Sequence, residues 1–176
     1  MKRHGFDELE RLLGMVDARL DENVRVIVIG GAAVALQLRA ADIVTKDVDT
    51  WENSGALTAL AREVGLELTP TPIAEMPYHF EDRLDTALRY TKLQVLVPER
   101  HDLVLSKIVR WHEGDEDHAR KLHDARPLDL DVLLERYRSE MTHVAGHPAR
   151  IRGHFVDCVR TLFGELASAR AARALA

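Results

Sequence analysis

A run of β-branched residues that ends in two glycines constrains the fold of this chain more than any other feature. Residues 24–29 read as a buried strand, and Gly30 and Gly31 follow it directly. The Ala- and Leu-rich residues 32–39 then favour a helix, and residues 46–51 favour a second strand. A buried strand that turns sharply into a helix is typical of folds that alternate strands and helices.

The second strand carries two acids one residue apart, Asp47 and Asp49. Side chains at i and i+2 of a strand project from the same face, so these carboxylates are expected to lie side by side, with Val48 facing the core. Aspartate is depleted in strands, and adjacent carboxylates repel each other. A divalent cation between them would remove that repulsion, and we therefore predict a metal site, with Mg²⁺ (or Mn²⁺) as the ion.

The Gly30-Gly31 turn complements this acid pair. A glycine turn that opens a helix presents backbone N–H groups and a helix N-terminus, where a phosphate group is favoured. Taken alone, the glycines could simply make a tight connection, since this is neither a Walker loop nor a GxGxxG fingerprint. Together with the acids, they favour a nucleotide phosphate site.

A Gly-Gly turn that opens a helix, followed by Asp-x-Asp on the next strand, resembles the motifs of the minimal nucleotidyltransferases of the DNA polymerase β-like superfamily. The chain looks most like the bacterial AbiEii-type toxin nucleotidyltransferases and the related family DUF6036. The segment 98–110, with Lys107, and the following Asp115-Glu116-Asp117 are similar to the Lys-helix-Asp element of those families. The resemblance covers roughly residues 6 to 140.

The resemblance implies roles for individual residues. Asp47, Asp49, Lys107 and Asp115 would be catalytic, with both of the first two as metal ligands, and Asp117 is the alternative to Asp115. The predicted nucleotide-binding residues are Gly30, Gly31, Thr45, Lys107 and Arg110. The alternatives are ordinary: Lys107 could be a surface lysine beside an apolar stripe, and Asp115 could cap a helix.

The chain departs from the family pattern at two points. The arginine expected just before the acid pair is absent, because the nearest one is Arg39. The strand predicted at residues 90–97 also lacks the third carboxylate of larger superfamily members. Asp82 and Asp85 precede that strand, and nothing in the sequence fixes their position.

The remaining pattern predicts an α/β (α+β) fold with a small mixed sheet, flanking helices and a helical C-terminal portion. Helices are expected at 6–20, 56–64, 99–112, 116–124, 129–140 and 151–173, with a short strand at 66–69, a loop at 70–82 and an undecided segment at 83–88. We expect a nucleotidyltransferase-like core at 1–125 and a helical extension packed on it at 126–176.

The amino-acid composition limits the cellular compartment and the classes of binding partner that we expect. A single cysteine, Cys158, fits a reducing compartment and a place in the core, and no apolar run could span a bilayer, so we expect a cytoplasmic protein without a membrane partner. The net charge of −5 argues against a wholly basic nucleic-acid binder, and no DNA partner is expected. Residues 150–176 nevertheless carry +3, either as a solvated helix face or as a surface for RNA or an acidic partner.

The leading hypothesis is an Mg²⁺-dependent enzyme that transfers a nucleoside monophosphate from an NTP to a hydroxyl of tRNA or protein. By resemblance it could be the toxin of a toxin–antitoxin pair, with an antitoxin as partner. The alternative is a non-catalytic module of the same fold that binds nucleotide or a protein. A zinc site around His112, His118 and His123 has little support, because the HExxH pattern is absent.

Overall fold

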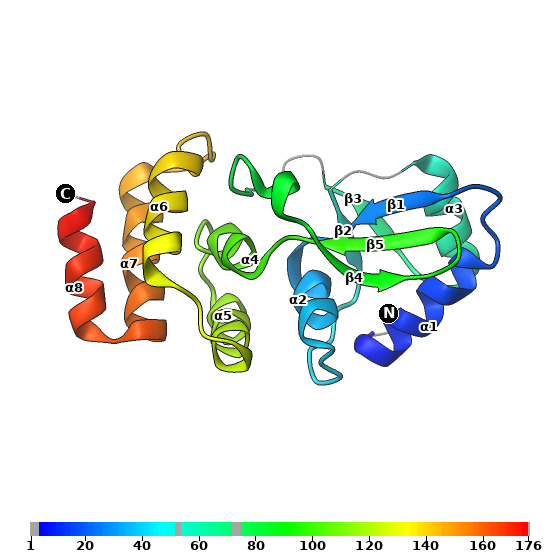
Figure 1. Cartoon of the computed structure of the whole chain (residues 1–176), viewed down its shortest axis with the longest axis horizontal. Coiled ribbons are helices and arrows are strands. Elements are labelled where there is room, and N and C mark those ends of the chain that lie inside the picture. The colour runs from blue at the N-terminus through cyan, green and yellow to red at the C-terminus, as the bar shows by residue number, and fades with distance from the viewer. Residues whose placement is uncertain (1–3, 52–53, 72–74, 176) are drawn as a thin grey trace. The chain divides into compact units, whose positions relative to one another are not determined.

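The computed structural model describes residues 4–51, 54–71 and 75–175. Contacts between residues divide the chain into two compact units. The first unit holds Met1–Ala74 and Arg83–Glu99, and the second holds Glu75–Asp82 and Arg100–Ala176. In this grouping the chain passes between the units more than once, the last time after Glu99. The sequence-based division after residue 125 stays a prediction. Figure 1 labels the elements of both units.

The first unit is built on a three-stranded sheet with the order β1-β5-β4. Its strands are β1 (Val24–Ile27), β4 (Asp85–Arg89) and β5 (Leu93–Val97). β1 and β5 are parallel, with Val26 opposite Val95, and β4 and β5 form an antiparallel hairpin. Val26, Leu88 and Val95 are buried, so this face of the sheet contributes to the core.

Two short parallel strands, β2 (Val48–Thr50) and β3 (Leu68–Pro70), form a second small sheet in this unit. An antiparallel bridge between Val28 and Thr50 joins it to the end of β1. The helices of the unit are α1 (Phe6–Asp17), α2 (Gly30–Leu38) and α3 (Gly55–Glu63). α1 buries one face, as its helical spacing of apolar residues predicts, whereas α2 is apolar and buried along most of its length.

The second unit is helical. Its helices are α4 (Arg100–Lys107), α5 (Glu113–Ala125), α6 (Leu130–Glu140), α7 (Pro148–Phe163) and α8 (Glu165–Ala174), and a 3₁₀ turn, η1 (Phe80–Arg83), lies at the change of unit. α4 packs on α5 and α6, α5 packs on α7, and α7 packs on α8. Phe155 of α7 is fully buried and stacks on Tyr137 of α6, with ring centroids 4.4 Å apart.

The predicted α/β class is confirmed, and the differences lie in element boundaries. The single helix expected at 151–173 is two helices, because Gly164 adopts a φ of +85° between them. The helix expected at 99–112 ends at Lys107, and Trp111 beyond it has a φ of +49°. The undecided segment 83–88 is mostly β4, and the strand expected at 90–97 begins at Leu93, because residues 90–92 form the hairpin turn.

None of the helices in the described part of the chain combines the length and the apolar character needed to cross a membrane. Val48 and Cys158 are buried, as expected from the sequence.

Candidate active site

The turn between β1 and α2 requires a glycine at its first position. Ile29 is extended, and Gly30 starts α2 with a φ of +68°, in the left-handed region that side chains disfavour. A Cβ atom on Gly30 would lie 3.0 Å from Oδ2 of Asp49. The missing side chain therefore leaves room for a carboxylate against the turn. α2 has no side-chain cap hydrogen bond at its N-terminus.

The backbone fixes Asp49 beside this turn. The N–H of Ile29 donates to the carbonyl of Asp49 at 2.9 Å, and the bridge between Val28 and Thr50 continues the pairing. Asp49 is the central residue of β2 and is partly exposed. Its position next to Gly30 follows from main-chain contacts on both sides.

Thr71 is a neighbour of Asp49 that the sequence did not single out. Its hydroxyl donates to Oδ1 of Asp49 at 3.3 Å. Asp49 pairs with Thr69 across β2 and β3, and Thr71 directly follows β3. Thr71 lies within the segment expected to be a loop, and only the parallel pairing of the two strands could have revealed it. It is a positioning residue for the carboxylate.

Asp47 does not lie on the strand, contrary to the sequence-based boundary. β2 begins at Val48, and Asp47 occupies the exposed bend before it. The hydroxyl of Thr45 donates to the carbonyl of Asp47 at 2.6 Å, a local bond that competes with strand pairing. Thr45 itself pairs with His4 through backbone hydrogen bonds in both directions. The Thr45 hydroxyl, which we expected to contact nucleotide, is therefore bonded to the main chain of Asp47.

The donor set at this turn suits a hard divalent cation only in part. Carboxylate oxygens are ligands of the kind Mg²⁺ prefers, and Gly30 leaves space beside that of Asp49. Among the described residues, no group of three or more His, Cys, Asp or Glu side chains is placed to hold a metal ion. A two-carboxylate site fits an Mg²⁺ ion that takes its other ligands from substrate phosphates and water.

Lys107 and Asp115 lie in the second unit and form a buried ion pair. Nζ of Lys107 lies 3.3 Å from Oδ1 of Asp115, and the two side chains are 3% and 7% exposed. Oδ2 of Asp115 accepts a hydrogen bond from the N–H of His112 at 3.2 Å, at the start of α5. Asp115 therefore caps α5 and pairs with Lys107 at the same time, both of which the sequence allowed.

Burial sets the electrostatics of this pair. Desolvation lowers the pKa of the Lys107 ammonium below 10.5, although Asp115 opposes that shift. The same effect, together with the nearby charge of Lys107, lowers the pKa of His118 from 6.5 to about 4. Nδ1 of His118 is buried and has no hydrogen-bond partner among the described residues. The imidazole is therefore neutral at physiological pH.

The other predicted residues of this element are more exposed. Nη2 of Arg110 lies 3.4 Å from Oδ1 of Asp115, and its side chain is 63% exposed. Asp117, the alternative to Asp115, pairs instead with Lys121 on the surface of α5. Whether Lys107 and Arg110 face the same substrate as Asp49 stays a prediction, because they belong to a different unit.

The two candidates for a third carboxylate fall in different units. Asp85 begins β4 in the first unit and accepts a hydrogen bond from Nε2 of Gln37 at 2.9 Å. Asp82 lies in the second unit, exposed, 3.6 Å from Nδ1 of His79. Neither carboxylate has a recorded contact with Asp49 in the described residues.

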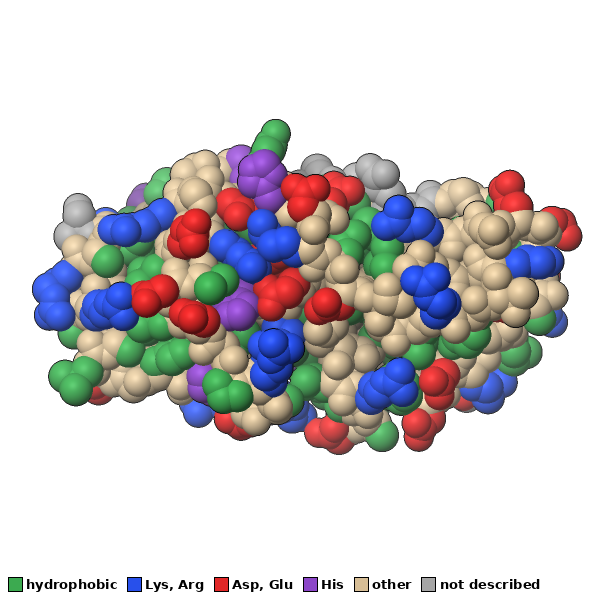
Figure 2. Space-filling model, viewed as in Figure 1, with side chains coloured by type: hydrophobic (Ala, Val, Ile, Leu, Met, Phe, Trp, Pro, Cys, Tyr) green, Lys and Arg blue, Asp and Glu red, His purple; other side chains and the backbone are tan. Residues whose placement is uncertain are grey.

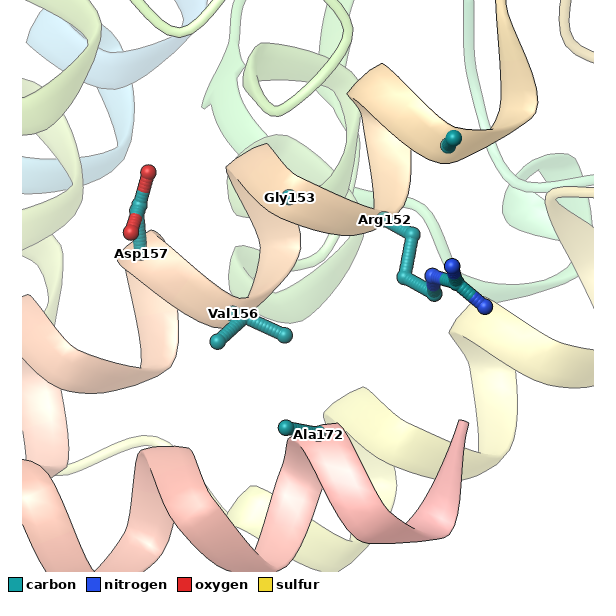
Figure 3. Close-up of a pocket in the computed structure, with 6 residues that line it drawn as sticks. Arg152, Gly153, Val156, Asp157 and Ala172 are labelled. Carbon is teal, nitrogen blue, oxygen red and sulfur yellow. The ribbon is translucent and has the colours of Figure 1, made fainter. Parts of the chain in front are cut away.

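A cavity of about 430 Å³ lies between α7 and α8 of the second unit. Figure 3 shows Arg152 and Asp157 extending from α7 on either side of Gly153 and Val156, with Ala172 of α8 opposite. Arg152 donates to the carbonyl of Leu175, and Asp157 pairs with Arg160. The cavity arises where small residues face each other, and its charged groups already have partners.

The comparison with protein families assigns the class. A model described as "Nucleotidyltransferase of unknown function (DUF6036)" matches residues 6–159, which include the turn, both acids and the Lys107–Asp115 pair. The class is therefore nucleotidyltransferase. The chain belongs to the DUF6036 family. No curated protein and no solved structure matches the chain.

Proposed function

We propose that this protein transfers a nucleoside monophosphate from an NTP to a hydroxyl group, with Asp47 and Asp49 as metal ligands. The observation that carries the proposal is the Asp49 carboxylate held against Gly30, at the start of α2. A carboxylate beside the N–H groups that open a helix would provide for both a cation and a phosphate within one turn of backbone. Membership of a nucleotidyltransferase family supports this use of the site.

Each residue of the candidate site would have its own role in binding the NTP and the metal ion. The N–H groups that open α2, at Gly30 and Gly31, orient the phosphates of the NTP. Thr71 holds Oδ1 of Asp49, so that Oδ2 keeps its direction toward the turn. Asp47, on the exposed bend, completes the pair of carboxylates. Bound Mg²⁺ or Mn²⁺ would supply Lewis-acid stabilisation of the charge that develops on the transferring phosphate.

The transfer itself forms one P–O bond and breaks another. The acceptor oxygen attacks the α-phosphorus, the bond from the α-phosphorus to the bridging oxygen of pyrophosphate breaks, and pyrophosphate leaves with that electron pair. The proton of the acceptor hydroxyl passes to a carboxylate oxygen of Asp49 or Asp47. No other residue in this proposal needs to change its protonation state.

In the second unit, we propose a phosphate role for Arg110 ahead of Lys107. Lys107 would have to leave a buried partner to reach a phosphate, which would leave Asp115 as an unpaired buried charge. Arg110 shares that partner while most of its side chain is exposed, and a guanidinium binds phosphate in a forked geometry. Lys107 then acts on Arg110 only through their shared carboxylate.

The likeness of the glycine turn and the acid pair to AbiEii-type toxins extends the proposal to tRNA or protein as acceptor, and to an antitoxin as partner. A non-catalytic module of the same fold is the alternative. It is favoured by the buried state of Lys107 and by the absence of a third acid near Asp49 among the described residues.

Label transfer tests the proposal. The full chain is incubated with each α-³²P-labelled NTP, Mg²⁺ and a bacterial lysate, followed by RNase or protease digestion. We expect label in a macromolecule with wild type and a loss of at least 100-fold with Asp49→Asn. Asp131→Asn, which alters an exposed acid at the start of α6, is the matched control. Equal transfer by wild type and Asp49→Asn would reject the role of Asp49.

Thermal unfolding, together with the label-transfer assay, distinguishes an active nucleotidyltransferase from a non-catalytic module that binds nucleotide. Mg²⁺-NTP at a hundredfold excess over its dissociation constant should stabilise the wild type by about 2.7 kcal/mol. Stabilisation that depends on Asp49, without label transfer to any acceptor, would identify the non-catalytic module. No stabilisation by any NTP would reject nucleotide binding.

A further inference from the structure

Three consecutive residues at the start of α1 contact the loop that connects α2 to β2. We call residues 4–6 the N-terminal segment and residues 39–47 the α2–β2 loop. In Figure 1 the start of α1 lies next to the chain that follows α2, within the first unit. The contacts run in antiparallel order, which pairs His4 with Thr45, Gly5 with Ala41 and the Phe6 ring with Arg39.

Two main-chain hydrogen bonds join the N-terminal segment to the loop. The N–H of His4 donates to the carbonyl of Thr45 at 2.7 Å, and the N–H of Thr45 donates to the carbonyl of His4 at 3.0 Å. Among the described residues, these are the recorded main-chain bonds between residues 41–47 and other segments. His4 is buried, so the bridge is packed into the unit. The α2–β2 loop therefore takes its main-chain pairing from the N-terminal segment.

Gly5 allows the loop to approach this closely. Its φ is −88°, which any residue adopts, so backbone freedom does not explain a glycine at this position. A Cβ atom on Gly5 would lie 2.6 Å from the carbonyl oxygen of Ala41. A contact that short would force the loop backbone to move. The absence of a side chain is therefore what keeps the two segments in contact.

The contact reaches Asp47 through Thr45. The main chain of Thr45 is held by His4, and its hydroxyl donates to the carbonyl of Asp47, two residues further on. β2 begins directly after Asp47. The main chain of Asp47 is therefore held on both sides, by Thr45 before it and by β2 after it.

The position of Asp47 matters because a site with two carboxylates depends on how each of them is held. Figure 2 shows Asp and Glu side chains interspersed with Lys and Arg on the visible face of the described residues. A divalent cation therefore gains little from general surface charge, and its affinity depends on individual ligands. A loop that is already ordered avoids the entropy cost of fixing a mobile ligand residue when the ion binds.

We infer that the N-terminal segment positions Asp47 for metal binding, through the His4–Thr45 bridge and the close approach at Gly5. The inference rests on the proposed function, since Asp47 is a metal ligand only in that proposal. His4 and Gly5 precede the range that the family model matches, which begins at residue 6. These positioning residues thus lie outside the sequence pattern of the family.

The test measures the affinity of the full chain for Mn²⁺ alone, from the EPR signal of the free ion. Gly5→Ala should weaken Mn²⁺ binding about fivefold, the effect of ordering one backbone residue when the ion binds. Gly5→Ser should weaken binding equally, although serine is a better N-cap residue for α1 than alanine. Gly55→Ala, at the start of α3 with open space around it, should leave the affinity unchanged.

A double-mutant cycle shows whether the effect acts through Asp47. In the Asp47→Asn background, Gly5→Ala should not weaken Mn²⁺ binding further, because the ligand that the segment positions is absent. An equal loss in both backgrounds would overturn the inference, since it would show a general disturbance of the unit.

Amide hydrogen exchange gives a readout that does not depend on the metal. The N–H of Thr45 should exchange faster in Gly5→Ala, whereas that of Leu13 within α1 should not change. Unchanged exchange at Thr45 would overturn the inference.

Thr45→Val tests the same path with Gly5 in place. Valine keeps the size of the side chain and removes the hydrogen bond to the Asp47 carbonyl, so Mn²⁺ binding should weaken. Thr45→Ser keeps the hydroxyl and should bind Mn²⁺ as the wild type does. Wild-type affinity in both Gly5→Ala and Thr45→Val would overturn the inference.

Failure of the inference and failure of the proposed function give different results. Loss of Mn²⁺ binding in Asp49→Asn, with wild-type binding in Gly5→Ala and Thr45→Val, would reject the role of the N-terminal segment alone. Mn²⁺ binding that depends on Gly5 and Asp47, without label transfer to any acceptor, would reject the catalytic proposal alone. No Mn²⁺ binding by the wild type would reject both the metal site and the inference.

Discussion

Asp49 and Asp115 are both acids that the family pattern marks as functional, and they occupy opposite environments. Asp49 is partly exposed beside a glycine turn, with a threonine hydroxyl on one of its oxygens. Asp115 is buried, pairs with Lys107 and caps α5. The first environment can accept a ligand at little cost, whereas the second is occupied by the protein's own groups. The two acids of the family pattern therefore differ: Asp115 is engaged by buried groups of the protein itself, and Asp49 is partly exposed.

Asp115→Asn should give the largest loss of stability, about 3 kcal/mol. The change leaves Lys107 buried without a counter-charge, and removing one partner of a buried pair is far more costly than losing the pair. Chemical denaturation measures the effect. Asp117→Asn, which alters an exposed pair on the same helix, should cost less than about 0.5 kcal/mol.

The double variant Lys107→Met/Asp115→Leu sharpens this result. Replacing both charges with apolar groups of similar size should recover much of the stability lost in Asp115→Asn. If the pair is structural, the double variant retains label transfer. A stable double variant without label transfer would show instead that Lys107 or Asp115 takes part in the reaction.

Gly30→Ala should destabilise by about 1–2 kcal/mol, the cost of a side chain in the left-handed region. The new Cβ would also lie 3.0 Å from Oδ2 of Asp49 and displace the carboxylate. Gly55→Ala, at the first position of α3 with open space around it, is the control and should be neutral or stabilising. Equal effects in the two variants would contradict the close approach of turn and acid.

The stability of the second unit should depend on pH through His118. Its pKa is about 4 in the folded state and 6.5 when unperturbed, so the unfolded chain binds a proton first as the pH falls. The contribution of neutral His118 is present above pH 6.5 and is lost between pH 6.5 and 4. His118→Gln should lose less stability than wild type across this interval, as measured by urea unfolding at each pH. Parallel curves would show that the imidazole protonates freely in the fold.

Asp49→Asn should have the smallest effect on stability, within about 0.5 kcal/mol of wild type. Asparagine keeps the shape and can still accept the hydrogen bond from Thr71. Stability is measured without nucleotide by thermal unfolding. A loss comparable to that of Asp115→Asn would remove the contrast between the two acids.

The sequence predicted the elements of the candidate site better than their edges. The glycine turn and the strand with Asp49 followed from local pattern, because β-branched residues and glycines act over a few positions. The start of β2 at Val48 did not, since the Thr45 hydroxyl donates to the Asp47 carbonyl and holds Asp47 in a bend. Residue type alone does not reveal such competition.

Contacts between residues far apart in the chain could not be predicted from the sequence for a different reason. The contact of Thr71 with Asp49 and the bridge between His4 and Thr45 depend on strand pairing and register, which a single sequence does not specify. The burial of Lys107 likewise depends on how α5 packs against α4. Lys107 was correctly placed on a helix, but its exposure depends on tertiary packing.

The parallel pairing of β1 with β5 also sets an order of events during synthesis. Val24 pairs with Leu93, so β1 emerges from the ribosome about 70 residues before its partner strand. At about 5–20 residues per second, the first strand and the acid turn wait roughly 4 to 14 s for the strand that completes their sheet. α7 and α8, joined through Gly164, can pair as soon as both are made. The nascent first unit thus carries an unpaired β-branched strand for seconds, an interval in which chaperone binding would protect it from aggregation.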